Sequence, residues 1–348
     1  MRPILEFGCV IYSHLREYRV RSLLLLERQA LRLCLGLPKT VPICVLYTEA
    51  RITPLDARFR TLTVRTFLRL LCHPLMKNTA LVRDLPSLLS TPWPRHNIPQ
   101  AVYVSQLLAE LGVNILHVQS LESTRTFTIE VKDAFPPGSK TLSPPVLASM
   151  LRRHLSRFTR HLAVASDASV SNEKAGAGVV IPVLDHRFPI RLPDYTPPFC
   201  AELLAAALAL KKAPPWFSRA LVLTDSLSLV RHLECCDSNT EIFRFLSTAA
   251  PSTISEVVFT WTPGHCGILI NEEADRLAKL SLTLPYVPVL TECALVITSR
   301  YERYERLRNP HLLVVNQPAF SHLRFPWRYD LAASRRCEIC LTHLRCRV

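Results

Sequence analysis

The sequence predicts an α/β protein, in which a mixed five-stranded sheet flanked by helices follows a mainly helical N-terminal region. Over residues 159–283, short apolar segments typical of strands alternate with helical segments in the order β-β-β-α-β-α-α-β-α. Helical connections between the later strands favour a mixed sheet covered by helices. Apolar residues make up 49% and charged residues 20% of the 348 residues, a composition that allows a sizeable core.

Residues 1–80 are predicted to form helices. Leucines and arginines recur at helical spacing from Leu23 to Leu35, and Gly36 then ends this helix. Thr53 and Pro54 are typical of a helix start, with Thr53 as the N-cap. The helix that follows carries four arginines: Arg58, Arg60, Arg65 and Arg69. These arginines form either a solvated helix face or a nucleic-acid contact.

The segments on either side of residues 159–283 have weaker patterns. Residues 81–158 are predicted to be a connector that is Pro-rich over 84–100 and then contains one helix and a short pair of strands. Residues 284–348 form a basic C-terminal tail, which ends with four potential zinc ligands at spacings of three: Cys337, Cys340, His343 and Cys346. A helix face rich in cysteine is the simpler interpretation, and a zinc site is the alternative.

Nine elements are expected within residues 159–283, of which the first three strands form an antiparallel meander. The predicted strands are 162–166, 176–182, 187–192, 219–225 and 256–261. The predicted helices are 201–212, 226–234, 241–250 and a last helix that opens at Asn271. Asn271 is expected to be its N-cap, with Glu272 and Glu273 in the first turn, where the helix dipole favours acids.

The distribution of charge indicates a polyanionic partner. The net charge of +14 predicts binding to nucleic acid or to an anionic surface. Residues 159–283 are the exception, with 11 basic and 13 acidic residues. No apolar run reaches the roughly 20 residues that span a bilayer, and the first residues do not resemble a secretion signal. We therefore expect an intracellular protein of the nucleus or cytoplasm, neither secreted nor bound to membranes, with reduced cysteines.

Four acidic residues occupy positions where an α/β sheet places its ligand-binding groups. Asp167 and Asp225 are expected at the ends of strands, and Glu202 and Asp275 in the first turns of helices. Any one of them alone would be interpreted as a surface charge or a helix cap. Four carboxylates in one pocket would repel each other, and hard cations such as Mg²⁺ relieve that repulsion. Two such ions can activate a water and stabilise the leaving oxygen of a phosphodiester.

The segment WTPGHCGILINEEADRLA, residues 261–278, runs from a strand through a loop into a helix. Gly264 and Gly267 flank His265 and are expected to make the loop mobile. An imidazole on a mobile loop beside a metal site suits proton transfer or product release. A loop histidine without any role is the alternative.

Four stretches together resemble the type 1 ribonuclease H domain, in the version carried by non-LTR retrotransposon polyproteins. They are ASDAS (165–169), AELLAAALAL (201–210), LTDSLSLV (223–230) and WTPGHCGILINEEADRLA (261–278). The four acids follow one another at spacings of 35, 23 and 50 residues, which fit that family. The resemblance implies a ribonuclease H-like fold that cuts the RNA strand of an RNA–DNA hybrid. It also implies two Mg²⁺ ions, with Mn²⁺ as a substitute, and no small-molecule cofactor.

The resemblance further implies a role for each residue. Asp167 would bridge both metal ions, and Asp275 would help to hold the ion that activates the water. Glu202 and Asp225 would hold the other ion, with Glu202 also close to the 2′-hydroxyl of RNA. His265 would be the mobile histidine. Three small polar residues fall where the family often contacts its substrate: Ser169, Asn172 and Ser226.

Several residues depart from the family pattern around these positions. Ala168 replaces a frequent glycine, and Leu227 follows Ser226 where a polar residue is sometimes used. Pro198–Cys200 precede Glu202 where some relatives have polar residues that bind the hybrid. These departures affect positions expected to bind substrate and leave the predicted metal ligands unchanged.

The N-terminal region resembles the thumb or connection that follows the polymerase palm in such polyproteins, through MRPILEFGCVIY, ERQALRLCLGLP and TEARITPLDAR. No two aspartates are adjacent in the chain, so the polymerase signature is absent and polymerase activity is not expected. An active hybrid nuclease is the main hypothesis. An inactive remnant that only binds nucleic acid is the first alternative. A related integrase or transposase is disfavoured, because those sites use fewer acids and lack the Gly-His-x-Gly loop.

Overall fold

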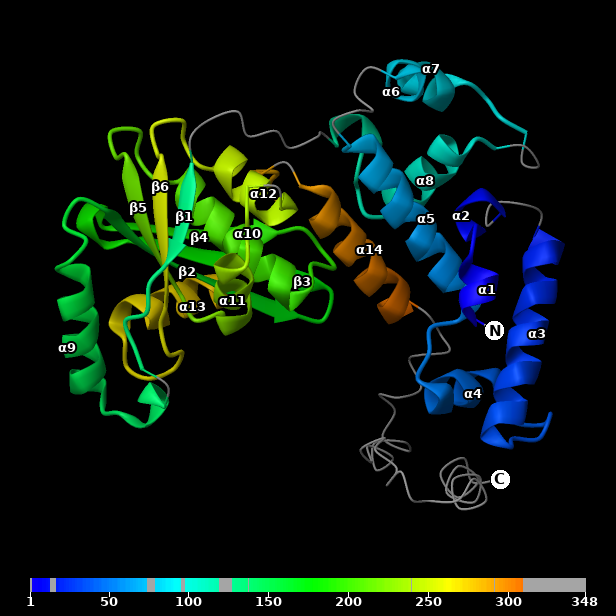
Figure 1. The fold of residues 1–348 in the computed structure, drawn as a ribbon, viewed down its shortest axis with the longest axis horizontal. Helices are drawn as coiled ribbons and strands as arrows, with labels where there is room; N and C mark the ends of the chain where they lie inside the picture. The colour runs from blue at the N-terminus through cyan, green and yellow to red at the C-terminus, as the bar shows by residue number, and fades with distance from the viewer. Residues whose placement is uncertain are drawn as a thin grey trace. The chain divides into compact units, whose positions relative to one another are not determined.

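The computed structural model describes residues 2–12, 17–73, 79–94, 98–118, 127–136, 138–238, 240–290 and 292–308. The chain forms two compact units (Figure 1). The helical unit comprises residues 1–71, 78–116 and 301–348, and the sheet unit comprises residues 72–77 and 117–300. Within the described ranges, no helix is both long enough and apolar enough to cross a membrane.

The helical unit confirms that the N-terminal region is mainly helical. Its helices are α1 (Arg2–Glu6), α2 (Cys9–Tyr12), α3 (Glu17–Leu35), α4 (Ile43–Ala50), α5 (Leu55–Leu71), α6 (Ala80–Arg83), α7 (Leu85–Ser90), α8 (Gln100–Ala109) and the end of α14 (Ala294–Arg308). Gly36 has a φ of +68° and follows α3, as predicted. The buried Glu27 carboxylate accepts hydrogen bonds from the Tyr47 hydroxyl at 2.9 Å and the Leu55 amide at 3.1 Å. One side chain of α3 thus ties α4 to the start of α5.

Three helices occupy residues 80–109, where the prolines predicted an irregular connector. Pro86 lies in the first turn of α7, and Pro99 is the N-cap of α8. Proline is tolerated at both places because the first amides of a helix have no intrahelical partner. The prolines therefore begin helices here.

The sheet unit contains a six-stranded mixed sheet. Its strands are β1 (Thr128–Val131), β2 (Leu162–Ser171), β3 (Lys174–Ile181), β4 (His186–Leu192), β5 (Arg219–Thr224) and β6 (Glu256–Trp261). They lie in the order β1-β6-β5-β2-β3-β4. The predicted meander is confirmed, because β2, β3 and β4 pair antiparallel. The other three pairs, β2 with β5, β5 with β6 and β1 with β6, are parallel.

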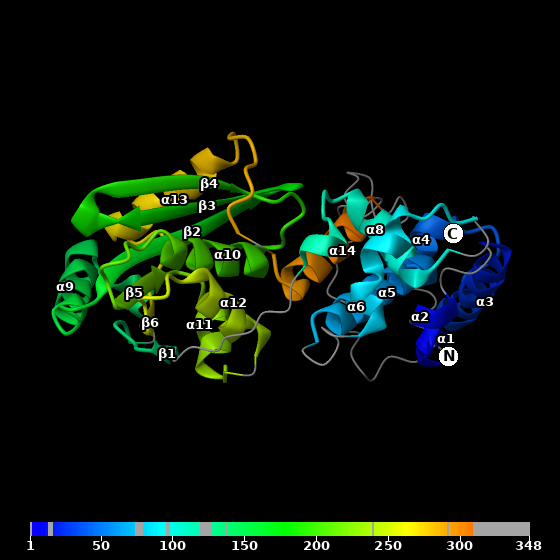
Figure 2. The same cartoon turned by 90° about the horizontal axis from the view of Figure 1, so that it is seen from above.

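Helices cover both faces of this sheet (Figure 2). One face packs on α10 (Pro198–Lys211), α11 (Leu227–Glu234) and α12 (Glu241–Ala249). The other face packs on α9 (Pro144–Leu155) and α13 (Leu269–Ser281). The α10 sequence is apolar on nearly every side, which fits a helix buried at the centre of its layer.

Two glycines in β3 let α13 lie unusually close to the sheet. A Cβ atom on Gly178 would be 2.0 Å from the Ala274 carbonyl oxygen, and one on Gly176 would be 1.8 Å from the Ser281 hydroxyl. Only a residue without a side chain fits at such distances. This close packing fixes the height of α13, the helix that carries Asp275, above β2 and β3.

The prediction of five strands was wrong by one, because β1 lies upstream of the segment that carried the strand pattern. Residues 101–158 contain a single described strand in place of the expected pair, together with α8 and α9. The partner of β1 is β6, and the two strands pair in register from Thr128 with Glu256 to Val131 with Phe259. A parallel partner more than 120 residues away leaves no hairpin signal in the local sequence.

The predicted start of the last helix was also wrong. The α13 helix begins at Leu269, and its N-cap is the buried Ile268, so Asn271 lies inside the first turn. The side chain of Asn271 is only 2% exposed and serves another purpose, described below. Residues 309–348, which include the four potential zinc ligands near the C-terminus, lie outside the described residues.

Candidate active site

Three of the predicted acids come from three different elements around the C-terminal end of β5. Asp225 directly follows β5, where the Trp261 indole donates to its carbonyl oxygen at 3.1 Å. Asp167 was expected at the end of a strand, but β2 continues to Ser171, and Asp167 pairs with Gly178 of β3. The parallel pairing of β2 with β5 stops two residues earlier, so Asp167 still lies just beyond the end of β5.

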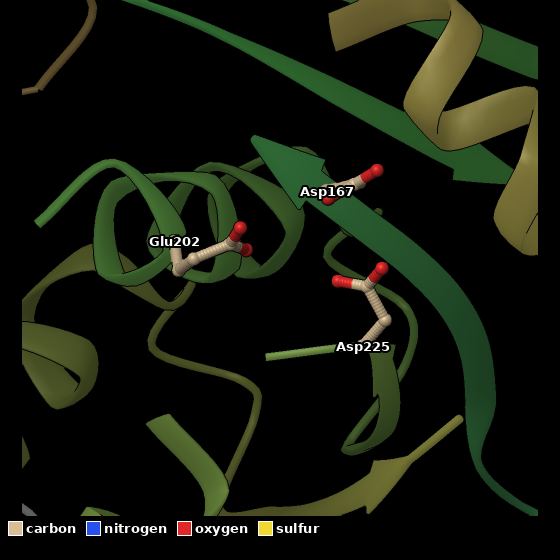
Figure 3. Close-up of side chains that lie close together, drawn as sticks. All are labelled: Asp167, Glu202 and Asp225. Carbon is tan, nitrogen blue, oxygen red and sulfur yellow. The ribbon is translucent and has the colours of Figure 1, made fainter. Parts of the chain in front are cut away.

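Glu202 reaches the same place from α10. It was expected in the first helical turn, but α10 begins at Pro198, so Glu202 lies in the second turn. One carboxylate oxygen from each of Asp167, Glu202 and Asp225 lies within 4.8 Å of the others (Figure 3). We call these three residues the carboxylate cluster.

The electrostatics of the carboxylate cluster are unfavourable without a cation. Burial and, after it, the neighbouring Asp225 charge raise the pKa of Asp167 to about 7, although the Ala168 amide opposes this rise by donating to Asp167 at 2.8 Å. Burial is also the main reason why the pKa of Glu202 lies well above its usual value, with the two aspartates adding to the rise. Asp225 shows the same direction, again chiefly through burial.

One oxygen of the cluster has no partner at all within the described structure. Glu202 Oε2 is buried and accepts no hydrogen bond. A buried acceptor left unsatisfied is costly, and a cation coordinated by carboxylate oxygens would remove that cost. The cluster therefore fits a hard divalent cation, held by Asp167, Glu202 and Asp225.

Asp275 lies apart from the carboxylate cluster. It occupies the second turn of α13, one turn later than predicted, since that helix begins at Leu269. Its Oδ2 accepts from the Lys279 ammonium at 2.6 Å, an i,i+4 pair, and lies 3.9 Å from His265 Nδ1. Its charge nonetheless raises the pKa of both aspartates of the cluster, so the four acids share one neighbourhood.

The loop that carries His265 is shaped by close packing. His265 has a φ of +56° and a largely exposed side chain. A Cβ atom on Gly264 would lie 2.4 Å from Asp225 Oδ2, so glycine is required there for close approach. Gly267 has a φ of +79° and lies against Pro144. Mobility of the loop, which the two glycines predicted, stays a prediction.

Sequence reasoning missed the part played by Asn271. The Thr262 hydroxyl donates to Asn271 Oδ1 at 3.1 Å, and the Asn271 side chain lies close enough to the Asp225 carboxylate to lower the pKa of Asp225 against the larger effect of burial. Asn271 thus links the loop, α13 and the cluster. Asn271 precedes two glutamates in the sequence, and this pattern is typical of a helix N-cap. Its place beside Thr262 and Asp225 arises only in the folded chain, so the sequence could not predict it.

The three predicted substrate residues lie at different distances along the chain from the acids of the cluster. Ser169 is two residues beyond Asp167 on β2 and therefore on the same side of the strand. Asn172 lies in the turn after β2 with a φ of +50° and is exposed. Ser226 follows Asp225 and caps α11, where its hydroxyl accepts from the Leu229 amide at 3.4 Å. For all three residues, a role in binding substrate stays a prediction.

The residues before Glu202 are used for packing. Cys200 is buried, and the Phe199 ring lies 4.9 Å from the ring of His232. Both anchor the start of α10 and so help to set the position of Glu202. Comparison with known proteins gives no further guide, because no family model and no curated protein matches this sequence.

Proposed function

We propose that the sheet unit is a metal-dependent endonuclease that hydrolyses the RNA strand of RNA–DNA hybrids. The observation that carries the proposal is the carboxylate cluster: three acids from β2, α10 and the end of β5 within 4.8 Å, one of them with a buried, unpartnered oxygen. Their positions match the order and spacing of the ribonuclease H motifs in the sequence. Such a cluster, unfavourable without a cation, is typical of phosphodiester hydrolysis.

Each residue has a defined task in this proposal. Asp167, Glu202 and Asp225 would hold Mg²⁺, or Mn²⁺, and two such ions would supply an activated water and charge stabilisation at the leaving oxygen. Asn271, fixed by Thr262 beside the Asp225 carboxylate, helps to position that carboxylate. Asp275 completes the ligand set once Lys279 releases it. His265, exposed on its loop and 3.9 Å from Asp275, moves protons at the edge of the site.

The resemblance to the ribonuclease H motifs also supports a mode of substrate selection. Glu202 and the small polar residues beside the cluster suit recognition of a 2′-hydroxyl, which distinguishes RNA from DNA. Contacts of this kind read the backbone, so we expect little preference for sequence.

The direct test is a cleavage assay of the full chain on labelled substrates in Mg²⁺. We expect cutting of an RNA–DNA hybrid and no cutting of duplex RNA or duplex DNA. EDTA and Asp225→Asn should each abolish the reaction, because both remove the cation from the cluster. Equal cutting of duplex DNA would contradict the proposal and favour an integrase or transposase.

A nucleic-acid-binding remnant without turnover is the second candidate. One observation favours it: Asp275, the fourth acid, is bonded to Lys279 at 2.6 Å and stands outside the cluster. If this pair persists with substrate bound, the ligand set stays incomplete. The same assay separates the two candidates, since a remnant would bind the hybrid and leave it intact.

A further inference from the structure

The segment from Phe127 to Leu155 lies upstream of every motif that resembles a nuclease, yet it is built into the sheet unit. β1 extends the sheet beside β6. Leu147 and Leu151 of α9 belong to the same buried cluster as Val258 of β6 and Ile268 at the start of α13. The segment therefore cannot be removed without opening the core that supports the His265 loop.

Between β1 and α9, the chain passes directly beside that loop. The Cys266 thiol lies 3.9 Å from the Lys140 carbonyl oxygen. A Cβ atom on Gly267 would lie 2.6 Å from Pro144 Cβ. The opposite end of the loop contacts the cluster, since Gly264 packs against Asp225. Figure 1 shows the turn that precedes α9 beside the segment that leads into α13. The loop is thus held between Asp225 and the turn around Lys140.

Lys140 is exposed on this turn and has no ion-pair partner among the residues that the structure describes. It lies on the turn that contacts the His265 loop at Cys266, and the other end of that loop packs against Asp225 of the cluster. Lys132, in the same segment, does have an ion-pair partner, because its ammonium lies 2.9 Å from the Glu130 carboxylate. Lys140 is therefore an available cation at the edge of an anionic site.

We propose that Lys140 binds a backbone phosphate of the nucleic acid strand that lies across the carboxylate cluster. The proposal rests on the proposed function and adds a binding residue that the nuclease motifs do not contain. A lysine ammonium is a common point-charge ligand for phosphate, and it can neutralise a phosphate next to the cluster without occupying the cluster itself. Such a contact fixes register and carries no sequence information.

The test compares two lysines of one segment in the full chain. Lys140→Gln and Lys140→Glu are measured against Lys132→Gln and Lys132→Glu, which change the net charge equally. Binding of a labelled hybrid is measured by fluorescence anisotropy at several salt concentrations, in an Asp167→Asn background that prevents cutting. We expect Lys140→Gln to weaken binding about two- to fivefold and to reduce the salt slope by about one. The Lys132 variants should leave both values nearly unchanged.

A second readout uses the chain with an intact cluster. There, Lys140→Gln should raise KM for hybrid cleavage while kcat changes little, since the residue binds without taking part in chemistry. The proposal is overturned if the Lys140 and Lys132 variants behave alike, whether both bind normally or both bind weakly. The proposed function can fail independently: a chain that binds the hybrid through Lys140 and never cuts it would keep this contact and lose the nuclease.

Discussion

At the scale of single residues, burial sets the chemistry of the carboxylate cluster. Asp167, Glu202 and Asp225 all have a pKa raised chiefly by burial, with mutual repulsion adding to it. Protonation relieves this repulsion at low pH, and a divalent cation would relieve it at neutral pH. Stability and cation binding are therefore linked through the same three side chains.

We expect the metal-free protein to lose stability as pH rises from about 4 to about 7. Burial raises the pKa of Asp167 from 3.8 to about 7, so in this window the folded state holds a proton that the unfolded chain has lost. The stabilisation is complete below the unfolded pKa and disappears as the pH approaches the folded pKa, a change on the order of 4 kcal/mol. Urea unfolding in EDTA across this range measures the effect. Asp167→Asn, which cannot titrate, should flatten the curve, and an unchanged slope in that variant would contradict the account.

Gly264→Ala should damage the metal site more than the fold. The added Cβ would meet Asp225 Oδ2 at 2.4 Å and force that carboxylate away from its partners. We expect at least a roughly tenfold loss of cleavage and weaker Mg²⁺ binding, because misplaced catalytic groups lose rate steeply. Gly112→Ala is the control: a side chain there is strained by the φ of +68°, but nothing lies within 4 Å of its Cβ, so stability should fall slightly while cleavage and Mg²⁺ binding stay normal. Normal Mg²⁺ dependence in Gly264→Ala would show that the packing of this loop is irrelevant.

At the scale of elements, α13 carries both Asp275 and the lysine that occupies it. Lys279→Met should free Asp275 to bind a cation, because the ammonium that now bonds to it at 2.6 Å is removed. We predict that the Mg²⁺ concentration for half-maximal cleavage falls by about two- to fivefold, the scale of one partly exposed ion pair. Lys279→Arg, which keeps the charge, should resemble the unmodified chain. A rise in the Mg²⁺ requirement would assign Lys279 a supporting role instead.

Packing of α13 on β3 should be sensitive to a single methyl group. In Gly178→Ala, the new Cβ would lie 2.0 Å from the Ala274 carbonyl oxygen, so the helix must move. We expect a loss of about 2–3 kcal/mol in the free energy of unfolding, the usual scale for overpacking. Chemical denaturation measures this, and the loss should exceed that of Gly112→Ala, where the only cost is a side chain at a φ of +68°. A stability close to that of the original chain would mean that α13 can shift freely.

The elements that were predictable are those whose signal is local. Alternating short strands and turns identified β2, β3 and β4, and proline-bounded apolar segments identified α10 and α12. Their ends agree within about three residues, except that β2 continues five residues past its predicted end at 166. β1 was missed because its partner, β6, is distant in the sequence. The start of α13 was missed because the Asn271 side chain is committed to Thr262 and Asp225, a contact that exists only in the folded state.

The candidate site was predictable to a similar extent. Motif order and spacing identified the acids, and the structure brings Asp167, Glu202 and Asp225 together. The engagement of Asp275 with Lys279 could have been suspected from their i,i+4 spacing. No pattern in the sequence pointed to Lys140, because its turn approaches the site only after β1 has joined the sheet.

At the scale of the whole molecule, we expect the fragment that can fold to be longer than the stretch that resembles a nuclease. A fragment of residues 117–300 should unfold cooperatively, whereas residues 159–283 alone should not. The shorter piece lacks Leu147 and Leu151, which cover Val258 and Ile268, and it exposes apolar surface. Thermal unfolding followed by circular dichroism distinguishes the two. A cooperative transition in the shorter fragment would show that β1 and α9 are dispensable.

The most direct test of the central claim is the chemistry of the product ends. The full chain is incubated with a labelled RNA–DNA hybrid in Mg²⁺, beside Asp225→Asn at equal hybrid binding, and the RNA termini are identified. A carboxylate-held metal site that activates water predicts 3′-hydroxyl and 5′-phosphate ends, absent in the variant. Uncut hybrid, or 2′,3′-cyclic phosphate ends that Asp225→Asn leaves unchanged, would contradict the assignment of the carboxylate cluster as the active site.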